Sequence, residues 1–244
     1  MQTLSSAQLL DIWERGRTQS LAERALLLLA AACPETSAEA LARLSVGRRN
    51  ARLLALCELT FGSCLTGLAN CPRCGERLEA TFTAADIRTS PADESVESLA
   101  LRVGDHEVQF RLPDSLDLMA LARSSDTAAA RRLLFERCLL DARSQHQAVS
   151  AHELPDEVVQ AVAARMAQAD PQADVRLALG CLSCGHRWLT AFEVVSFFWS
   201  EIDTWAVRLL HEVHTLASAY GWSEAEILAL SSRRRQLYLE MVSG

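Results

Sequence analysis

Two short stretches decide the fold of this chain: Cys71-Pro-Arg-Cys74-Gly75 and Cys181-Leu-Ser-Cys184-Gly185. Each has the Cys-x-x-Cys-Gly spacing of a zinc knuckle, in which the glycine lets the backbone turn tightly and direct its amides at sulfur. Together they supply four thiolates, the ligand set of a tetrahedral zinc ion. We therefore expect Cys71, Cys74, Cys181 and Cys184 to bind one Zn²⁺. Because four cysteines leave no position open for water, this zinc is expected to be structural and not catalytic.

The alternatives are chance pairing among the eight cysteines and thiol exchange. A thioredoxin-like pair begins a helix in a βαβ unit, whereas strand-like alternation flanks both pairs here. The apolar residues of this alternation are Leu78, Ala80 and Phe82 after the first pair, Val175, Leu177 and Leu179 before the second pair, and Trp188 and Phe192 after it. The flanks favour two hairpins joined by one metal, as in a zinc ribbon.

The two pairs are separated by 106 residues, far more than a compact ribbon uses, so a subdomain must be inserted between them. We expect a mainly α fold with a small β component, in which helical N- and C-terminal blocks are joined by a split zinc-ribbon-like unit. The expected organisation is an N-terminal helical block over 1–66, the first knuckle and a β segment over 67–100, an inserted β and helical subdomain over 101–173, the second knuckle and hairpin over 174–193, and a C-terminal helical block over 194–244. No internal repeat stands out.

The amino-acid composition is typical of a globular protein with a hydrophobic core. Half of the 244 residues are apolar, which is enough for a real core, and all 24 basic residues are arginine. The longest apolar run, 25–33, is too short to span a bilayer, so we expect a cytoplasmic protein with no membrane partner. Reduced cysteines suit that compartment, and Cys33, Cys57, Cys64 and Cys138 are expected to be buried core thiols.

Capping signals predict the helices of the N-terminal block. Ser20 with Glu23 and Thr36 with Glu39 have capping-box spacing, and Ser45 can cap a third helix that ends near Gly62. The inward side of this third helix carries Leu53, Leu54, Cys57 and Phe61, and its outward side carries Arg48, Arg49 and Arg52, which we expect to be a solvated face.

The inserted segment combines a hairpin with helices. Alternation over 101–112 around Gly104-Asp105 predicts two strands. Three amphipathic segments follow, marked by Leu118 and Leu121, by Leu133, Leu134, Cys138 and Leu139, and by Val158, Val159, Val162 and Met166. Residues 144–150 and 169–173 are expected to be loops.

The C-terminal block has the strongest helical pattern. Its apolar stripe is Phe198, Ile202, Trp205, Leu209, Val213, Leu216 and Tyr220, and Gly221 ends the helix. A capping box at Ser223 and Glu226 and a serine at 231 or 232 predict two short helices after it. Phe197, Trp199 and Trp222 fall off the stripe, so we predict that they form a second face that contacts a partner, the alternative being that they belong to the core.

Enzyme signatures are missing from the sequence. His211-Glu212-Val213-His214 places its histidines three apart, whereas the HExxH motif of metalloproteases needs a spacing of four. No glycine-rich phosphate loop, GxSxG elbow or cysteine and histidine pair for catalysis is evident. We therefore expect a non-enzymatic protein.

Two classes remain. A zinc ribbon joined to a helix-turn-helix regulator would read DNA with Arg233, Arg234 and Arg235. However, consecutive arginines spread around a helix, and a net charge of −7 opposes binding to phosphate, so no nucleic-acid partner is favoured. A protein-interaction module fits better.

Several stretches resemble a known family. The run 221–230 followed by 233–240 is similar to the ending of phage tail and baseplate assembly proteins, and 209–217 fits that ending. Residues 41–48, the first knuckle through Glu76, and 110–113 also resemble baseplate hub assembly chaperones of T-even phages and their relatives in contractile injection systems. The resemblance covers most of the chain. It implies a non-enzymatic protein that binds hub or spike subunits during baseplate assembly, as a chaperone or a baseplate component, in the cytoplasm of a bacterial host or in the assembled particle.

Overall fold

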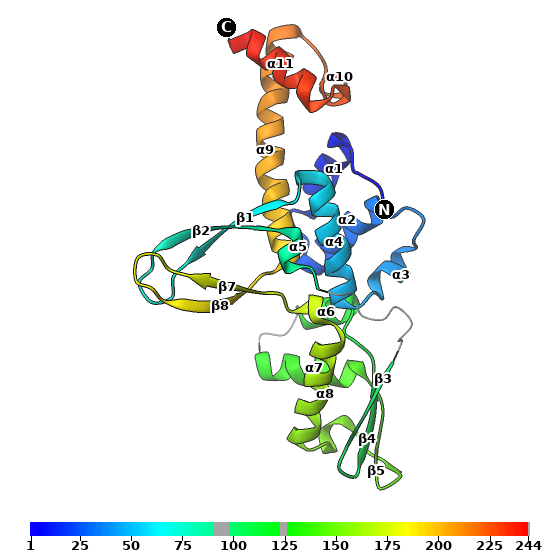
Figure 1. Cartoon of the computed structure of the whole chain (residues 1–244). Coiled ribbons are helices and arrows are strands. Elements are labelled where there is room, and N and C mark those ends of the chain that lie inside the picture. Colours follow the sequence, from blue (N-terminus) through cyan, green and yellow to red (C-terminus); the bar gives the residue numbers. More distant parts are fainter. Residues whose placement is uncertain (90–97, 123–125, 244) are drawn as a thin grey trace.

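The computed structural model describes residues 1–89, 98–122 and 126–243. The undescribed residues fall in three of the predicted segments, 67–100, 101–173 and 194–244. Figure 1 shows an elongated molecule in which the N-terminal helices pack along one side of the lower part of one long helix, two β hairpins project to the other side, and the inserted subdomain lies at the end opposite the C-terminus. This is the predicted mainly α fold with a split hairpin pair. Among the described residues, no helix is both long and apolar enough to cross a membrane.

Four helices form the N-terminal block: α1 (Ser6–Gly16), α2 (Leu21–Ala32), α3 (Ala38–Ala42) and α4 (Val46–Phe61). The capping box of Ser20 and Glu23 and the cap of α4 by Ser45 are confirmed. The predicted box of Thr36 and Glu39 is wrong by one residue, because the hydroxyl of Ser37 accepts from the amide of Ala40 and begins α3.

The long helix α9 (Val194–Tyr220) organises the main core. Its buried side packs against α1, α2 and α4, and Leu28, Leu53, Phe198 and Ile202 are fully buried there. Each such side chain stabilises the fold by about 2 kcal/mol through removal of apolar area from water. Gly221 ends α9 with a φ of 69°, in the left-handed region that favours glycine.

Two two-stranded antiparallel sheets form the projecting hairpins. The first pairs β1 (Cys64–Asn70) with β2 (Arg77–Thr83), which leads into the short helix α5 (Ala84–Ile87); the second pairs β7 (Arg176–Gly180) with β8 (Arg187–Ala191). Because β1 begins at Cys64 and points that residue outward, the expectation of a buried thiol is wrong for Cys64, whereas Cys33, Cys57 and Cys138 are buried.

The inserted subdomain is a four-stranded sheet with helices on its buried face. The strands lie in the order β3 (Leu99–Val103), β4 (His106–Phe110), β5 (Leu139–Ser144) and β6 (Gln147–Ala148). The helical elements are α6 (Ser115–Leu121), α7 (Thr127–Cys138), the 3-10 turn η1 (Ala151–Glu153), α8 (Asp156–Ala169) and the 3-10 turn η2 (Pro171–Ala173). Leu139, expected in a helix, begins β5, because pairing with β4 overrides local propensity. The segment 144–150, expected as a loop, holds a tight turn and β6.

A buried polar seam fixes the inserted subdomain to α4. The carboxylate of Asp170 accepts from the amide of Gly47 at 2.8 Å, and Asn50 donates to the carbonyl of Gln172 at 3.2 Å. The side chain of Gln172 donates to the carbonyl of Ile87 and accepts from Thr89. Arg49 is also buried beside this seam, so the prediction of a solvated face is wrong for that residue.

A second buried polar cluster lies between α6 and α7. Both oxygens of Asp117 accept from Arg111, at 2.6 and 2.9 Å, and Arg137 adds a third bond at 2.8 Å. Burial acts to raise the pKa of Asp117, but its hydrogen bonds with Arg111, with the Asp114 amide and with Arg137 lower it to about 2.

The C-terminal head consists of α10 (Glu224–Ala229) and α11 (Ser232–Ser243), which fold back on the far end of α9. Val213, Leu216 and Ile227 form its small core. The capping box of Ser223 and Glu226 is present as expected.

Candidate metal centre

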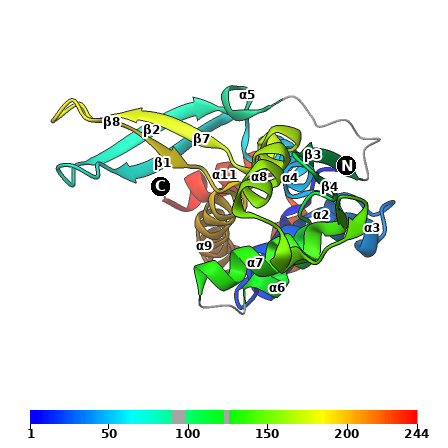
Figure 2. The ribbon, with the colours of Figure 1, turned by 90° about the horizontal axis from the view of Figure 1, so that it is seen from below.

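The four predicted cysteines meet at the tip of the two hairpins. We call the hairpins β1–β2 and β7–β8, with their connecting knuckles, the cysteine arm, residues 64–83 and 176–191. The two hairpins extend together away from the helices, as the view from below shows (Figure 2). The Sγ atoms of Cys71 and Cys184 lie 3.7 Å apart and those of Cys74 and Cys181 lie 3.6 Å apart.

These distances fit a tetrahedral thiolate site. A zinc–sulfur bond of about 2.3 Å gives a tetrahedron whose sulfurs are about 3.8 Å apart, whereas a disulfide needs about 2.05 Å. All four Sγ atoms lie within 4.8 Å of one another, and among the described residues no other group of three or more histidine, cysteine or acidic side chains is arranged in this way. The arrangement therefore has the ligand number and size for one Zn²⁺.

The two knuckles have the same backbone conformation. The amide of Gly75 donates to the carbonyl of Cys71, and the amide of Gly185 donates to that of Cys181, both at 2.9 Å. Both glycines have positive φ, 76° and 69°, a conformation that glycine adopts without strain. Each glycine thus closes a turn that brings two thiols of one knuckle to the same side.

Sequence inspection missed that the arm is an internal repeat. The pattern Cys-x-x-Cys-Gly-x-Arg occurs at 71–77 and again at 181–187, and each arginine is the first residue of the returning strand. The signal for this repeat is the short shared pattern itself, which becomes visible when the two knuckles are aligned on their cysteines. The site is therefore built from two equivalent halves that lie 106 residues apart in the chain.

Neighbouring thiols influence one another's protonation. For Cys71, burial raises the pKa, but hydrogen bonds from the amides of Cys74 and Arg73 outweigh it and lower the pKa to about 7. For Cys74, a backbone hydrogen bond at Glu76 lowers the pKa, but bonds with neighbouring thiols raise it to about 12. One thiolate therefore opposes ionisation of the next, and a bound cation would release the remaining protons.

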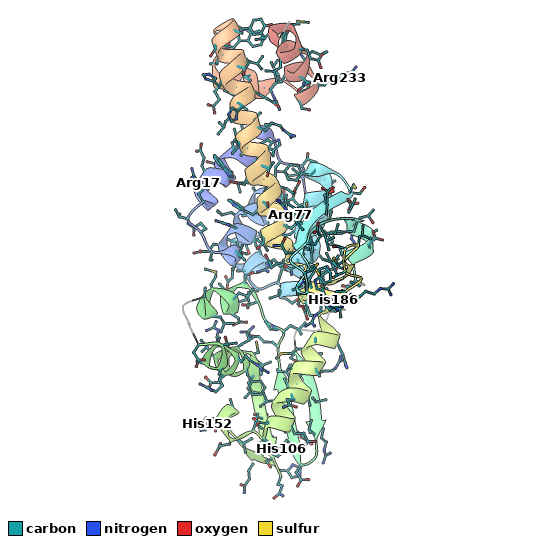
Figure 3. All side chains as sticks on the ribbon, turned by 90° about the vertical axis from the view of Figure 1, so that its left-hand side faces the viewer. Arg17, Arg77, His106, His152, His186 and Arg233 are labelled. Carbon is teal, nitrogen blue, oxygen red and sulfur yellow. The ribbon has the colours of Figure 1, made fainter. Side chains whose placement is uncertain are left out.

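Each hairpin of the cysteine arm has one shielded face and one exposed face. Burial alternates along every strand, and Phe82 packs edge-on against Phe192 at the base of the arm with ring centroids 5.2 Å apart. Arg77 and His186 lie on the arm in Figure 3, far from Arg233 in the head and His106 in the inserted subdomain. Leu65, Phe82 and Leu177, close to the base of the arm, pack in the main core, and the cysteine cluster lies at the outer end of the arm.

The three predicted partner residues have different environments. Trp199 is 7% exposed, and Arg24 lies over its ring, with the guanidinium 4.5 Å from the centroid. Phe197 is half-buried against Phe192. Trp222 is half-buried in the head. Burial of Trp199 favours a role in the core, and partner binding by the three residues stays a prediction.

The other motifs considered from the sequence do not meet at this site. His211 and His214 are exposed on α9, in a different part of the molecule from the cysteines. Arg235 is 3% exposed and bonds Glu212 at 3.1 Å and the carbonyl of Leu230 at 2.8 Å. Only Arg233 and Arg234 of the arginine run therefore face solvent.

The fold and the site define a mainly helical protein whose two distant knuckle hairpins form one four-cysteine cluster. Residues 4–199 match the model of the T4 bacteriophage base plate protein family, so the chain belongs to that family. No curated protein and no solved structure matches the chain. The match includes both knuckles and the inserted subdomain but ends within α9, so the C-terminal resemblance at 209–240 lies outside it.

Proposed function

We propose that this chain is a non-enzymatic protein of baseplate assembly that binds hub or spike subunits of a contractile tail, in a phage or a related injection system. The observation that carries the proposal is the family match over residues 4–199. The role is a chaperone or a baseplate component, acting in the bacterial cytoplasm or within the assembled particle.

Zinc has a structural role in this proposal. Cys71, Cys74, Cys181 and Cys184 hold Zn²⁺ and join the two hairpins, which support the long insertion between them. The Sγ distances of 3.6 and 3.7 Å support this assignment. When bound, such an ion contributes folding free energy and leaves no position for a substrate.

Partner contacts are proposed on α9 and the head, through Phe197, Trp199 and Trp222. Tyr220, Trp222 and Tyr238 form an aromatic cluster in which the ring centroids of Trp222 lie 4.6 and 4.9 Å from those of the two tyrosines. Tyr220 is 39% exposed, and partly exposed aromatic groups of this kind often anchor protein interfaces.

The proposal is tested by purifying the tagged full chain from cells that express its native gene cluster, with mass spectrometry of bound proteins and metal analysis of the same sample. Copurifying hub or spike subunits and one zinc per chain are expected. Purified particles that lack the protein would identify a chaperone, and particles that contain it would identify a component. Absence of every tail protein from the sample would overturn the assembly role.

A further inference from the structure

The two hairpins of the cysteine arm are equivalent in their knuckles but differ on their exposed faces. The exposed positions of the first hairpin include Thr66, Leu68, Asn70, Arg77, Glu79 and Thr81; the equivalent positions of the second are Arg176, Ala178, Gly180, Arg187, Leu189 and Ala191. The repeat therefore allows a position-by-position comparison between the halves of one arm.

The exposed face of the first hairpin is an ordinary solvated surface. Thr66 and Thr81 pair across the strands with their hydroxyls 3.5 Å apart, and Leu68 lies opposite Glu79. The polar side chains of this face thus have polar neighbours, and its apolar side chain, Leu68, lies opposite the carboxylate of Glu79. This pairing is typical of a surface that faces solvent.

The exposed face of the second hairpin is apolar and open. Leu189 is 65% exposed, and the residue opposite it across the strands is Ala178. Gly180 lies opposite Arg187, so small residues leave a shallow hollow of about 610 Å³ beside the arginine and the leucine. Leu182, in the knuckle itself, is 96% exposed. Exposed leucines next to a hollow are typical of a contact surface.

The charges on this hairpin have one sign. No aspartate or glutamate occurs between residues 175 and 191, although the chain has a net charge of −7. Arg176 pairs with Asp174 at 2.8 Å, whereas Arg187 has no ion pair within the described part of the chain. By contrast, the first hairpin carries Glu76 and Glu79 beside its arginines. An unpaired guanidinium beside exposed leucines is complementary to a partner that presents carboxylates next to an apolar side chain.

We propose that the exposed face of β7–β8, with Arg187 and Leu189 on its strands and Leu182 at its tip, is a docking surface for an acidic, partly apolar segment of a baseplate protein. The class of partner rests on the proposed function, whereas the surface and its preference for acid rest on the arm. Bound zinc would hold Leu182 and Arg187 in a fixed relation, so the arm loses little conformational freedom when it binds.

The arm supplies its own matched controls. Arg187→Glu and Leu189→Glu each place an acid on the proposed surface, whereas Arg77→Glu and Leu68→Glu make the same changes on the other hairpin, where Leu68 is 61% exposed. Each tagged full-length variant is expressed with the native gene cluster, and bound baseplate proteins are quantified. Zinc content and the melting temperature are measured for each, and they are expected to be unchanged because all four side chains are exposed.

We expect Arg187→Glu and Leu189→Glu to reduce the bound baseplate protein roughly tenfold, as loss of a central interface residue does, and Arg77→Glu and Leu68→Glu to retain it. Arg187→Gln should also weaken the dependence of binding on salt, because it removes the charge without adding a new one.

Equal retention of baseplate protein by all four glutamate variants would overturn the docking surface while leaving the assembly role intact. Loss of binding by the control variants to the same extent would also overturn it. If the wild-type chain binds duplex DNA through Arg187 instead of a baseplate protein, the acidic partner is wrong. If the wild-type chain captures no baseplate protein, the proposed function in baseplate assembly is wrong, and the docking surface loses its proposed class of partner.

Discussion

Single side chains hold the most exposed part of the molecule together. The four thiols of the cysteine arm are 3.6 to 3.7 Å apart in pairs, at the end of two hairpins. A small sheet cannot hide enough apolar surface to be stable by itself, so its stability depends on what closes its tip.

Cys184→Ser should abolish stoichiometric zinc binding and lower the melting temperature, because structural zinc contributes on the order of ten kcal/mol to folding. Metal analysis and thermal unfolding measure both effects. Cys64→Ser is the control, since Cys64 is exposed and lies outside the cluster. A Cys184→Ser protein that binds one zinc and melts like the wild type would contradict the four-ligand site.

The free energy of unfolding should depend on pH at low pH because of Asp117. Its pKa is lowered from an ordinary 3.8 to about 2 in the folded chain, so its contribution of about 2 kcal/mol is fully present above about pH 5 and is lost as the pH falls toward 2. The difference in unfolding free energy between wild type and Asp117→Asn should therefore shrink by that amount between pH 6 and about pH 2. Urea unfolding of both proteins across this range measures it, and zinc release affects both alike. A constant difference would show that the carboxylate is not stabilised by Arg111 and Arg137.

Sequence alone predicted that the four cysteines come together, but it did not predict the buried polar residues. The cysteines are identifiable because their spacing follows from the turn that each knuckle makes. Arg49 and Asp117 look like surface residues in a polar pattern. The acidic groups near Arg49, Glu193 and Asp170, lie more than 100 residues along the chain, and Arg137, which bonds Asp117, lies 20 residues along it. No local pattern encodes those contacts.

At the scale of elements, α1 and α9 approach each other closely in the main core. A Cβ atom added to Gly16 would lie 2.1 Å from a ring carbon of Trp199. Trp13 on the same helix donates to Asp203 of α9 at 2.8 Å. The two helices approach closely because position 16 has no side chain.

Gly16→Ala should destabilise the protein by about 1–3 kcal/mol, the usual range for overpacking. The double variant Gly16→Ala with Trp199→Leu should lose less stability than the sum of its single changes, because the smaller side chain makes room. Denaturant unfolding of the four proteins measures this coupling. Gly67→Ala is the control, since its nearest neighbour would be 3.9 Å away. Additive effects of the two changes would mean that the helices do not meet through these residues.

Helices were easier to predict than strands. The caps at Ser20, Ser45 and Ser223 use local hydrogen bonds that the sequence displays directly. By contrast, β5 has the sequence Leu-Leu-Asp-Ala-Arg-Ser, which has little β propensity, and it is a strand because β4 pairs with it. Its start was therefore assigned to the preceding helix.

At the scale of the whole molecule, the polar seam determines whether the inserted subdomain moves with the helical core. Gln172 alone connects η2 to Ile87, Thr89 and Asn50 through side-chain and backbone bonds. Gln172→Ala should cost about 1–3 kcal/mol, because it leaves the amide of Thr89 and the carbonyl of Ile87 without their side-chain partner. Hydrogen exchange should then rise at the Thr89 amide. Gln109→Ala, on the exposed face of the inserted sheet, should leave exchange at Thr89 unchanged. Equal exchange in both variants would show that the seam does not join the two parts.

The wide separation of the two knuckles means that the first is synthesised well before the second. Cys71 and Cys74 leave the ribosome 106 residues before the second pair begins at Cys181. At about 5–20 residues per second, this delay is about 5 to 20 s. For that time the first hairpin has half of its ligands, and its two thiols are open to oxidation or to binding by the wrong metal. If the four cysteines hold zinc as proposed, the complete site can form only after this interval.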